Sequence, residues 1–344
     1  MAWEDVGVNP PAAPGRPRAV TQEDVARAVG VSRTLVSFAF RGAPGVSEET
    51  KQAILDAAKR LGYRPNAVAA DLARKQASAV GLYLLDLRNE VYADIFTGVR
   101  EALGQARNRL ILSVAPSTSG VDVASVGSLI EARVGIIIAA TLVDTDERIQ
   151  ELARTVPLVN VARFVEGVDS VYSDDRAGAR VATEHLLSLG HTRVAHVSGP
   201  RHEGHVGRWR AYEAVMLKAG LTPRTVFADD YTQEAAERAA VALLAGPTRP
   251  TAVFAHNDEI ALGIREAAYK QGLSVPGDLS LVGYDDSRIA HLQGIDLTSV
   301  DLKALELGRI AGAAALERLA TPDAPIVDRR LDPRLVLRQS TGPV

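Results

Sequence analysis

Hydrophobic and polar residues follow two different periods along the chain, and the change falls near Ala79. Between Thr21 and Tyr63 apolar residues recur every three or four positions, the period of amphipathic helices. From Ala79 onward, short apolar runs alternate with longer amphipathic stretches, as strands alternate with helices in α/β proteins. The pattern therefore predicts a small all-helical region followed by a much larger α/β region.

Three helices are predicted between Thr21 and Tyr63. Thr21, Ser32 and Ser47 each precede an amphipathic stretch, and their side chains can accept a hydrogen bond from a free N–H group at a helix start. Gly30 stands where the first helix should end, because glycine readily adopts the left-handed conformation of a helix terminus. Three short helices so close together predict a small bundle rather than part of a sheet.

The first two of these helices have the spacing of a helix-turn-helix motif. Ala26 is small enough for close helix contact, and Gly30 follows four residues later in the turn. The second helix then presents one side with the residues Arg33, Thr34, Ser37, Phe38 and Arg41. Arg and Thr can hydrogen-bond to base edges or phosphates, and Phe can pack on a thymine methyl group. The alternative for Phe38 is that it folds back into the bundle.

Seven apolar runs in the second region are predicted strands. They are Val80–Leu85, Leu110–Val114, Gly135–Ala139, Pro157–Val161, Val194–Ser198, Ala252–Ala255 and Leu279–Tyr284. Amphipathic helices are expected between strands, for example at Arg180–Leu189, Gln233–Leu244 and Glu259–Gln271. This alternation predicts parallel sheets with helices on both faces. About 265 residues of it exceed one doubly wound domain, so we expect two similar lobes.

Two segments outside these regions differ in composition. Residues 1–18 are rich in Pro, Ala and Gly and are expected to form a disordered tail. Ala67 to Lys75 is a short, Ala-rich helical segment, and an isolated helix of this length is marginal in water. The N-terminus lacks the apolar core of a signal peptide, and no apolar run reaches the length of a membrane span, so we expect a cytoplasmic protein.

Charge and cysteine content change the picture in different ways. The 344 residues carry 39 Lys and Arg against 42 Asp and Glu, and this net charge of −3 argues against a nucleic-acid-binding protein. Residues 19–75, however, hold nine basic and six acidic side chains, whereas residues 76–344 hold 28 and 34. A modestly basic helical region thus precedes an acidic α/β region. The absence of cysteine excludes disulfides, thiolate nucleophiles and Cys-type metal sites.

Several motifs resemble the lactose repressor/galactose repressor family of bacterial transcription factors. Residues 20–75 resemble the headpiece and hinge of that family. Four further motifs follow in family order: TEHLLSLGHTRVAHVSGP (183–200), PTAVFAHNDEIALG (250–263), SVPGDLSLVGYDD (274–286) and LTSVDLKALELG (297–308). Several long motifs in one order make a chance match improbable.

The resemblance implies an α/β fold with an all-α N-terminal domain. After the tail, a helix-turn-helix headpiece is expected over 19–65 and a hinge helix with its linker over 66–78. A two-lobed, periplasmic-binding-protein-like core of doubly wound parallel sheets would then occupy 79–344. The N-lobe would comprise about 79–174 and 302–319 and the C-lobe about 175–301 and 326–342, so that the chain crosses between lobes three times.

The function that the resemblance implies is that of a repressor whose operator affinity is controlled by a small-molecule effector. A homodimer would bind a pseudo-palindromic operator, and its hinge helices would insert Leu72 into the minor groove. The expected DNA contacts, which include helix N-termini facing phosphates, are Thr21, Ser32, Arg33, Thr34, Ser37, Phe38, Arg41, Ser47, Asn66, Ala69, Leu72 and Lys75.

The effector is expected between the two lobes, and a sugar or sugar derivative suits the residues best. By resemblance the contacts are Tyr92, Arg163, His202, Arg208, Tyr231, Asn257 and Asp285. The Arg208 guanidinium can grip hydroxyls or a carboxylate, and an ionised Asp285 can accept two sugar hydroxyls. Asn257 has an alternative role as the cap of a helix starting at Glu259. No cofactor and no metal are expected.

Some positions depart from the family pattern. Phe38 stands where arginine is usual, which removes an arginine–guanine contact. Asp71 precedes Leu72 and would repel phosphate. Leu302 stands where a polar ligand contact is common, and Ala162 replaces the usual aspartate before Arg163. These departures concern the operator and the identity of the effector.

Other classes of protein fit less well. No G-x-G-x-x-G follows the strand at Val80–Leu85, and no P-loop or G-x-S-x-G is present, so the chain is not expected to be an enzyme. His202 and His205 are not spaced like the histidines of zinc proteases. A sugar-binding protein without DNA binding does not explain the helix-turn-helix. A purine, nucleoside or other metabolite acting as co-repressor is the alternative effector.

Overall fold

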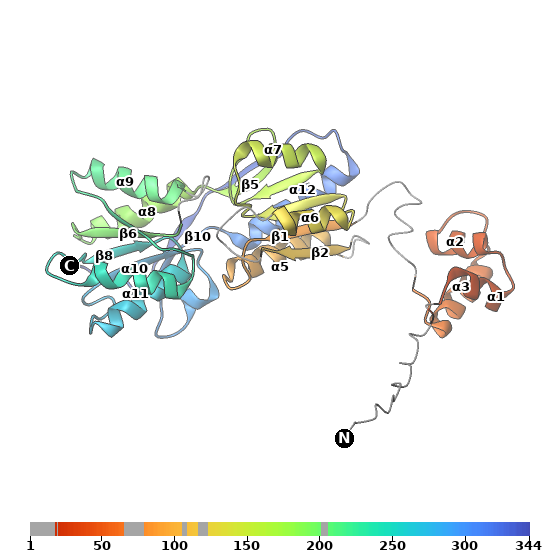
Figure 1. Ribbon diagram of the computed structural model, residues 1–344, viewed down its shortest axis with the longest axis horizontal. Coiled ribbons are helices and arrows are strands. Elements are labelled where there is room, and N and C mark those ends of the chain that lie inside the picture. Colours follow the sequence, from red (N-terminus) through yellow and green to blue (C-terminus); the bar gives the residue numbers. More distant parts are fainter. Residues whose placement is uncertain (1–17, 19, 65–78, 105–108, 116–122, 201–205) are drawn as a thin grey trace, which may run out of the picture. The chain divides into compact units, whose positions relative to one another are not determined.

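Figure 1 presents the computed structural model, which describes residues 18, 20–64, 79–104, 109–115, 123–200 and 206–344. The chain divides into two compact units, residues 1–76 and 77–344. The expected tail up to residue 17 and the expected hinge contacts lie outside the described residues, as does His202. Those hinge contacts are Asn66, Ala69, Leu72 and Lys75.

The described part of the first unit is a bundle of three helices. They are α1 (Gln22–Val29), α2 (Arg33–Arg41) and α3 (Glu48–Leu61). The Thr21, Ser32 and Ser47 side chains each accept a backbone N–H from the following helix, which confirms the predicted caps. Gly30 ends α1 at a φ of 74°, a conformation that suits glycine.

A small apolar core holds these three helices together. Val25 and Ala26 of α1, Val36 of α2 and Ile54 of α3 are buried against one another. Leu35 is half-buried, and Ala39 takes the second buried position of α2. The bundle therefore has a core of its own, as the helical periodicity predicted.

Two six-stranded sheets form the second unit (Figure 1). The first has the order β11-β5-β4-β3-β1-β2 and the second β12-β10-β9-β8-β6-β7. The strands of the first sheet are β1 (Val80–Leu84), β2 (Leu110–Val114), β3 (Ile136–Ala140), β4 (Leu158–Val161), β5 (Asp169–Ser173) and β11 (Asp328–Leu331). Those of the second are β6 (Val194–Ser198), β7 (Arg224–Phe227), β8 (Ala252–Ala255), β9 (Ser280–Tyr284), β10 (Thr298–Asp301) and β12 (Arg334–Val336).

Most neighbouring strands are parallel, as the alternation of strands and helices predicted. Among the described strand pairs, only β10 with β12 is antiparallel. Both faces of the central strands β1 and β3 are buried, and Leu82 of β1 lies opposite Ile138 of β3. All seven predicted strands form, with ends shifted by at most one residue.

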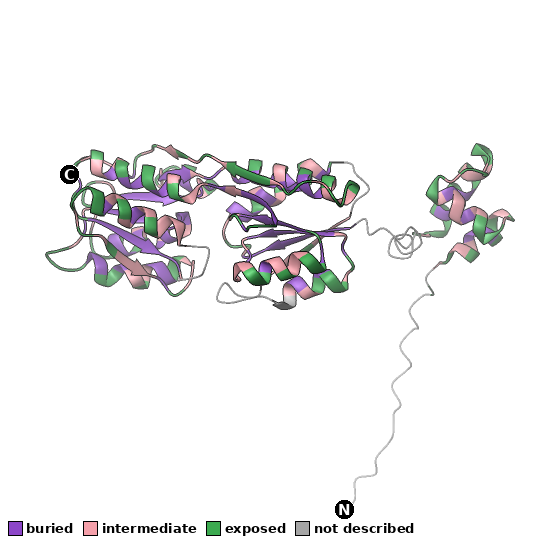
Figure 2. Ribbon diagram, turned by 90° about the horizontal axis from the view of Figure 1, so that it is seen from above, coloured by how far each residue is buried: buried purple, intermediate pink, exposed green. Residues whose placement is uncertain are grey.

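Helices cover both faces of each sheet. On the first sheet, α5 (Val91–Leu103) and α12 (Ala304–Ala320) share a core with one face, and α6 (Val123–Glu131) and α7 (Asp146–Thr155) with the other. On the second, α8 (Asp175–Ser188) and α9 (Gly207–Lys218) cover one face, and α10 (Gln233–Leu244) and α11 (Asp258–Lys270) the other. Figure 2 shows buried strands between helices whose outer sides are exposed. A short 3-10 helix, Arg288–His291, follows β9.

The closest helix contact in the first sheet's layer is between α5 and α12, and glycines make it possible. A Cβ atom on Gly98 would lie 2.1 Å from the Leu305 carbonyl oxygen, and one on Gly308 would lie 2.2 Å from that of Ile95. No side chain fits at such distances, so the two backbones touch only because both residues are glycine. This contact fixes α12, which follows the second sheet in sequence, on the first sheet.

Among the described residues the chain passes between the two sheets three times. It leaves the first sheet after β5, returns after β10 to form α12 and β11, and leaves again for β12. The expected assignment of 326–342 to the C-lobe is therefore wrong at its start. Asp328–Leu331 pairs in parallel with β5, and the final passage falls between Leu331 and Arg334.

No described helix is long and apolar enough to cross a membrane.

Candidate functional site

A pocket in the second unit lies where strands of both sheets end. Asp86 follows β1, Thr141 follows β3 and Arg163 follows β4 in the first sheet. Asn257 follows β8 and Asp285 follows β9 in the second. Parallel sheets bind ligands at the carboxyl ends of their strands, so two sheets meeting in this way form a binding cleft. The space free of protein atoms among these residues is about 890 Å³, including the part open to solvent.

The structure brings together the described members of the expected effector site. The pocket is lined by Tyr92, Arg163, Arg208, Tyr231, Asn257 and Asp285. They come from two sheets and from segments up to almost two hundred residues apart. His202 lies outside the described residues, and so does the rest of its His-Glu-Gly-His run.

Arg208 occupies the centre of the charge arrangement. It is the second residue of α9, and its Nε donates to Asp175 Oδ1 at 3.0 Å. Its Nη1 donates to the His256 carbonyl oxygen at 2.7 Å and lies 3.6 Å from Asp285 Oδ1. Its guanidinium also lies over the Tyr284 ring, 3.6 Å from the ring centre. These contacts hold the guanidinium plane in one orientation toward the pocket.

Burial and charge act in opposite directions on the Arg208 guanidinium. Removal from water disfavours its charged form, but Asp175, Tyr284 and Asp285 favour that form more strongly and raise its pKa. Arg208 therefore remains a cation, with Asp175 and Asp285 as its counter-ions.

Asp285 is a buried carboxylate in an unusual backbone conformation. It is 7% exposed and has a φ of 102°, in the left-handed region that non-glycine residues rarely adopt. Asn89 Nδ2, from the other side of the pocket, donates to its Oδ2 at 3.1 Å. Burial raises the pKa of Asp285 to about 6, although Arg208 and the Asn89 hydrogen bond oppose the shift. Strained positions of this kind cluster at binding sites.

The other expected effector contacts, Arg163, Tyr92 and Tyr231, also contact or pack against other residues of the protein. Arg163 forms an ion pair with Asp146 and donates to the Asp144 carbonyl oxygen. Tyr92 is buried, and Tyr231 packs 5.2 Å from the His256 ring. Burial raises the pKa of both tyrosine hydroxyls, which therefore remain neutral. The two rings can supply the apolar surfaces on which a pyranose ring packs.

Asn257 has the structural role that was left open, and it also lines the pocket. Its Oδ1 accepts the Ile260 N–H at 2.9 Å, so it caps α11. Its position among the pocket residues leaves its amide NH₂ group as the part that can serve a ligand. Asp258 is not a cap, because its carboxylate accepts hydrogen bonds from Ser287 and Ser299.

Sequence reasoning did not select several pocket residues. Asp175 pairs with Arg208, Asn89 pairs with Asp285, and Ser173 lines the pocket from the end of β5. The Ser173 hydroxyl is buried and has no hydrogen-bond partner within the described part of the chain. A buried hydroxyl without a partner is costly, and a ligand hydroxyl would satisfy it. The only sequence signal was the pair Asp174-Asp175, which forms the cap and the first residue of α8.

The first unit presents the expected nucleic-acid contacts on α2 and at the helix starts. Arg33, Thr34 and Arg41 are exposed, and Ser37 and Phe38 are half-buried. The Arg41 guanidinium lies 5.1 Å from the Phe38 ring centre, and its Nε donates to the Ser37 carbonyl oxygen. Phe38 is not part of the apolar core of the bundle. The ring therefore remains on the surface beside a cation, which suits contact with a base and its phosphate.

Comparison with known proteins finds matches to both units. Residues 21–66 match the family described as bacterial regulatory proteins of the lacI family, and residues 183–341 match the periplasmic binding protein-like domain. The catabolite control protein A of Priestia megaterium is 32% identical over 94% of this chain and 99% of its own length. The ribose operon repressor of Escherichia coli K12 is 30% identical over 93% of this chain and 99% of its own length.

Solved structures show the same similarity. A lac repressor dimer bound to operator and the anti-inducer ONPF matches with a TM-score of 0.82 and 26% identity, covering 94% of this chain and 100% of that one. A transcriptional regulator of the same family from Enterococcus faecium, with bound ribose, matches with a TM-score of 0.69 and 26% identity, covering 77% and 99%.

Proposed function

Because the chain belongs to the LacI family of bacterial regulatory proteins, we propose that it is a DNA-binding repressor whose operator affinity is controlled by a sugar bound in the pocket of residues 77–344. In this proposal a homodimer binds a pseudo-palindromic operator through α2 and the hinge residues. The chain then has no catalytic role, and it acts on the chromosome in the cytoplasm.

The observation that carries the proposal is the arrangement of Arg208 between Asp175 and Asp285 in the pocket. Fixed charged donors and acceptors together recognise the paired hydroxyls of a sugar, each of which both donates and accepts. Asn89, Asn257 and the Ser173 hydroxyl add neutral polar groups, while Tyr92 and Tyr231 add flat apolar surface. This mixture suits a pyranose or furanose ring better than a purely apolar ligand.

The charges of the pocket favour an uncharged sugar over a sugar acid or sugar phosphate. Both arginines among the described lining residues already pair with carboxylates, Arg208 with Asp175 and Arg163 with Asp146. Asp285 adds a further negative charge. An anionic ligand would have to compete with these partners and approach buried carboxylates, at a cost in free energy.

The first experiment tests DNA binding by selection from random duplexes, which requires no operator sequence in advance. Duplexes selected from a random library by the full chain should converge on a pseudo-palindrome whose half-sites lie about one helical turn apart. Thr34→Ala should weaken the selected sequence preference at one base position per half-site by about 1–3 kcal/mol. Leu112→Ala, in the second unit, is the matched control and should leave the preference unchanged. Selection without sequence convergence would contradict the proposal.

The effector is then identified by thermal shift and calorimetry with a panel of compounds. The panel contains neutral mono- and disaccharides, the corresponding sugar phosphates and uronic acids, and purines and nucleosides. The expected result is stabilisation by a neutral sugar with a change of operator affinity, and both effects should be weaker in Asp285→Asn at the same sugar concentration. A response to purines alone would replace the sugar with a nucleobase co-repressor.

A further inference from the structure

Two carboxylates lie behind the pocket without lining it, Asp258 and Asp286. Asp258 is 3% exposed and begins α11. Its Oδ2 accepts the backbone N–H and the hydroxyl of Ser287, both at 2.8 Å, and its Oδ1 accepts the Ser299 hydroxyl at 2.6 Å. Ser299 Oγ in turn accepts the Asp286 N–H at 3.1 Å. Asp258 thus ties the segment after β9 to strand β10.

The segment that Asp258 holds contains the pocket carboxylate Asp285. Asp285 and Asp286 both have positive φ, 102° and 51°. Two consecutive non-glycine residues in this region do not persist unless the surroundings impose the conformation. The Asp285 N–H donates to the Val300 carbonyl oxygen at 2.9 Å, which fixes its backbone to β10. The side chains of these two residues consequently leave the backbone in different directions and serve different partners.

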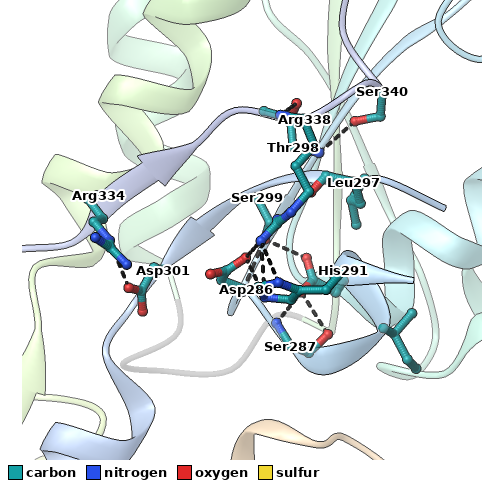
Figure 3. Close-up of polar contacts among 12 residues, drawn as sticks. Asp286, Ser287, His291, Leu297, Thr298, Ser299, Asp301, Arg334, Arg338 and Ser340 are labelled. Atoms are coloured by element: carbon teal, nitrogen blue, oxygen red, sulfur yellow. Dashed lines mark hydrogen bonds and ion pairs between the residues drawn. The ribbon is translucent and has the colours of Figure 1, made fainter. Parts of the chain in front are cut away.

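Arg338, just past β12, holds the Asp286 side chain. Its Nη2 donates to Asp286 Oδ1 at 2.6 Å, and both side chains are about nine-tenths buried, with 12% and 10% exposed. Its Nη1 donates to the Leu297 carbonyl oxygen at 2.7 Å, and its backbone N–H donates to Thr298 Oγ1. Figure 3 shows Arg338, Asp286, Ser287 and Ser299 gathered together with the His291 ring among them. His291 Nε2 lies 3.0 Å from Arg338 Nη2 and 3.4 Å from Asp286 Oδ1. Arg338 therefore anchors Asp286 to the end of β10 opposite the pocket.

We propose that Arg338 and Asp286 are positioning residues for the effector carboxylate Asp285, and that their ion pair sets sugar affinity without touching the sugar. The proposal rests on the proposed function in that it takes the pocket to bind an effector. Loss of Arg338 leaves the buried Asp286 carboxylate without its main cation. The turn can then relax toward ordinary φ values, and the Asp285 oxygens move relative to Arg208. A displacement of this kind at a binding carboxylate is expected to cost affinity steeply.

The chain offers a matched control for Arg338 four residues earlier, at Arg334. Arg334, in β12, pairs with Asp301 at 3.0 Å and is 72% exposed, and Figure 3 shows this pair apart from the Arg338 cluster. Arg338→Met and Arg334→Met remove the same charge from the same crossing segment. Arg338→Met should raise the Kd for the sugar identified in the panel by about tenfold or more. Arg334→Met should change that Kd by less than about twofold. Arg338→Lys should recover part of the loss.

A double-mutant cycle separates positioning from general destabilisation. If Arg338 acts through Asp285, the effect of Arg338→Met on sugar affinity should largely disappear in an Asp285→Asn background. Operator affinity without sugar should be the same in Arg338→Met and in the unaltered chain. Equal affinity losses in the two backgrounds, or no loss in Arg338→Met, would overturn the proposal.

The proposal can fail separately from the function. The ¹³C resonance of the Asp285 carboxyl group, assigned by its absence in Asp285→Asn, requires no ligand. It should move in Arg338→Met and not in Arg334→Met, even if every sugar in the panel fails to bind. A resonance that is unchanged in Arg338→Met would refute the positioning role of Arg338. Failure of every sugar in the panel to bind would refute only the proposal that the effector is a sugar.

Discussion

At the scale of single residues, the pocket combines the buried carboxylate of Asp285 with the mostly buried guanidinium groups of Arg208 and Arg163. Asp285 and Asp175 neutralise Arg208, and burial in turn raises the pKa of Asp285 to about 6. Near pH 6, therefore, Asp285 changes from a carboxylate that only accepts hydrogen bonds to a protonated carboxyl group that also donates one. Its affinity for a hydroxylated ligand depends on which form is present.

Effector affinity is predicted to fall as the pH drops through about 6. An ionised Asp285 accepts two hydroxyl hydrogens, so the sugar binds the deprotonated form, and protonation competes with binding. Calorimetry between pH 5 and 8 should show a plateau above about pH 7 and a loss approaching tenfold at pH 5. Asp285→Asn should bind more weakly with little dependence over this range. An equally steep profile in that variant would assign the titration to another group.

Ser173→Ala should weaken sugar binding without destabilising the protein. The Ser173 hydroxyl is buried and has no partner among the described residues, so its removal costs the free protein no hydrogen bond. In the complex the ligand loses one partner, and we expect about 0.5–1.5 kcal/mol of affinity to be lost. The control is Ser113→Ala, whose hydroxyl lies outside the pocket. An unchanged sugar Kd in Ser173→Ala would remove Ser173 from the site.

At the scale of secondary-structure elements, the strands that periodicity predicted are the apolar ones. Strands β1, β3 and β9 are buried on both faces and appear in the sequence as continuous apolar runs. Strand β11 contains Asp328, Arg329 and Arg330 and is exposed at a sheet edge, so hydrophobicity could not reveal it. It forms because β5 offers a row of unpaired backbone groups.

In the candidate site, too, some residues could be predicted from the sequence and others depend on the three-dimensional structure. Arg208 and Asp285 were predicted because they resemble family positions, Asp285 within the long motif at 274–286 and Arg208 outside the quoted motifs. The structure places both in the pocket. Ser173 and Asn89 could not be found in this way. Their importance comes from burial and from contacts across the pocket, which depend on how two sheets meet.

Gly308→Ala should lower the free energy of unfolding by about 1–3 kcal/mol or more. The added methyl group would overlap the Ile95 carbonyl oxygen where α12 crosses α5, and neither backbone can move without disturbing the first sheet. Gly127→Ala in α6 is the matched control, since no atom lies within 4 Å of its Cβ position. That change should be neutral or stabilise by up to about 1 kcal/mol. Denaturant unfolding measures both, and equal stabilities would show that the helices can separate at little cost.

At the scale of the whole second unit, the two sheets contact each other directly at the pocket rim. Besides the Asn89–Asp285 hydrogen bond, Glu90 Oε2 accepts the Ile289 N–H at 3.2 Å. Glu90 Oε1 also lies 3.6 Å from Arg288 Nη2. These contacts join residues about two hundred positions apart in the chain. They favour an arrangement in which the pocket residues of both sheets face one ligand.

Glu90→Ala should weaken sugar binding a few-fold, because the contact with Ile289 helps to hold the two sheets together around the ligand. A hydrogen bond to a charged, partly exposed group contributes roughly 0.5–1.5 kcal/mol. Small-angle X-ray scattering without sugar should give a larger radius of gyration for Glu90→Ala than for the unaltered chain. Glu147→Ala, at the exposed start of α7, is the control. Unchanged scattering and affinity in Glu90→Ala would show that the rim contact has no such role.

The three passages of the chain between the sheets also bear on how the protein is made. Strands β11 and β12 are among the last described elements, yet each completes a different sheet. Neither sheet can therefore be finished on a ribosome until nearly the whole chain has emerged. At about 5–20 residues per second, the helical bundle ending near Leu61 is synthesised on the order of ten seconds or more earlier. During every round of translation, then, the helical bundle is synthesised before either sheet of the second unit can be completed.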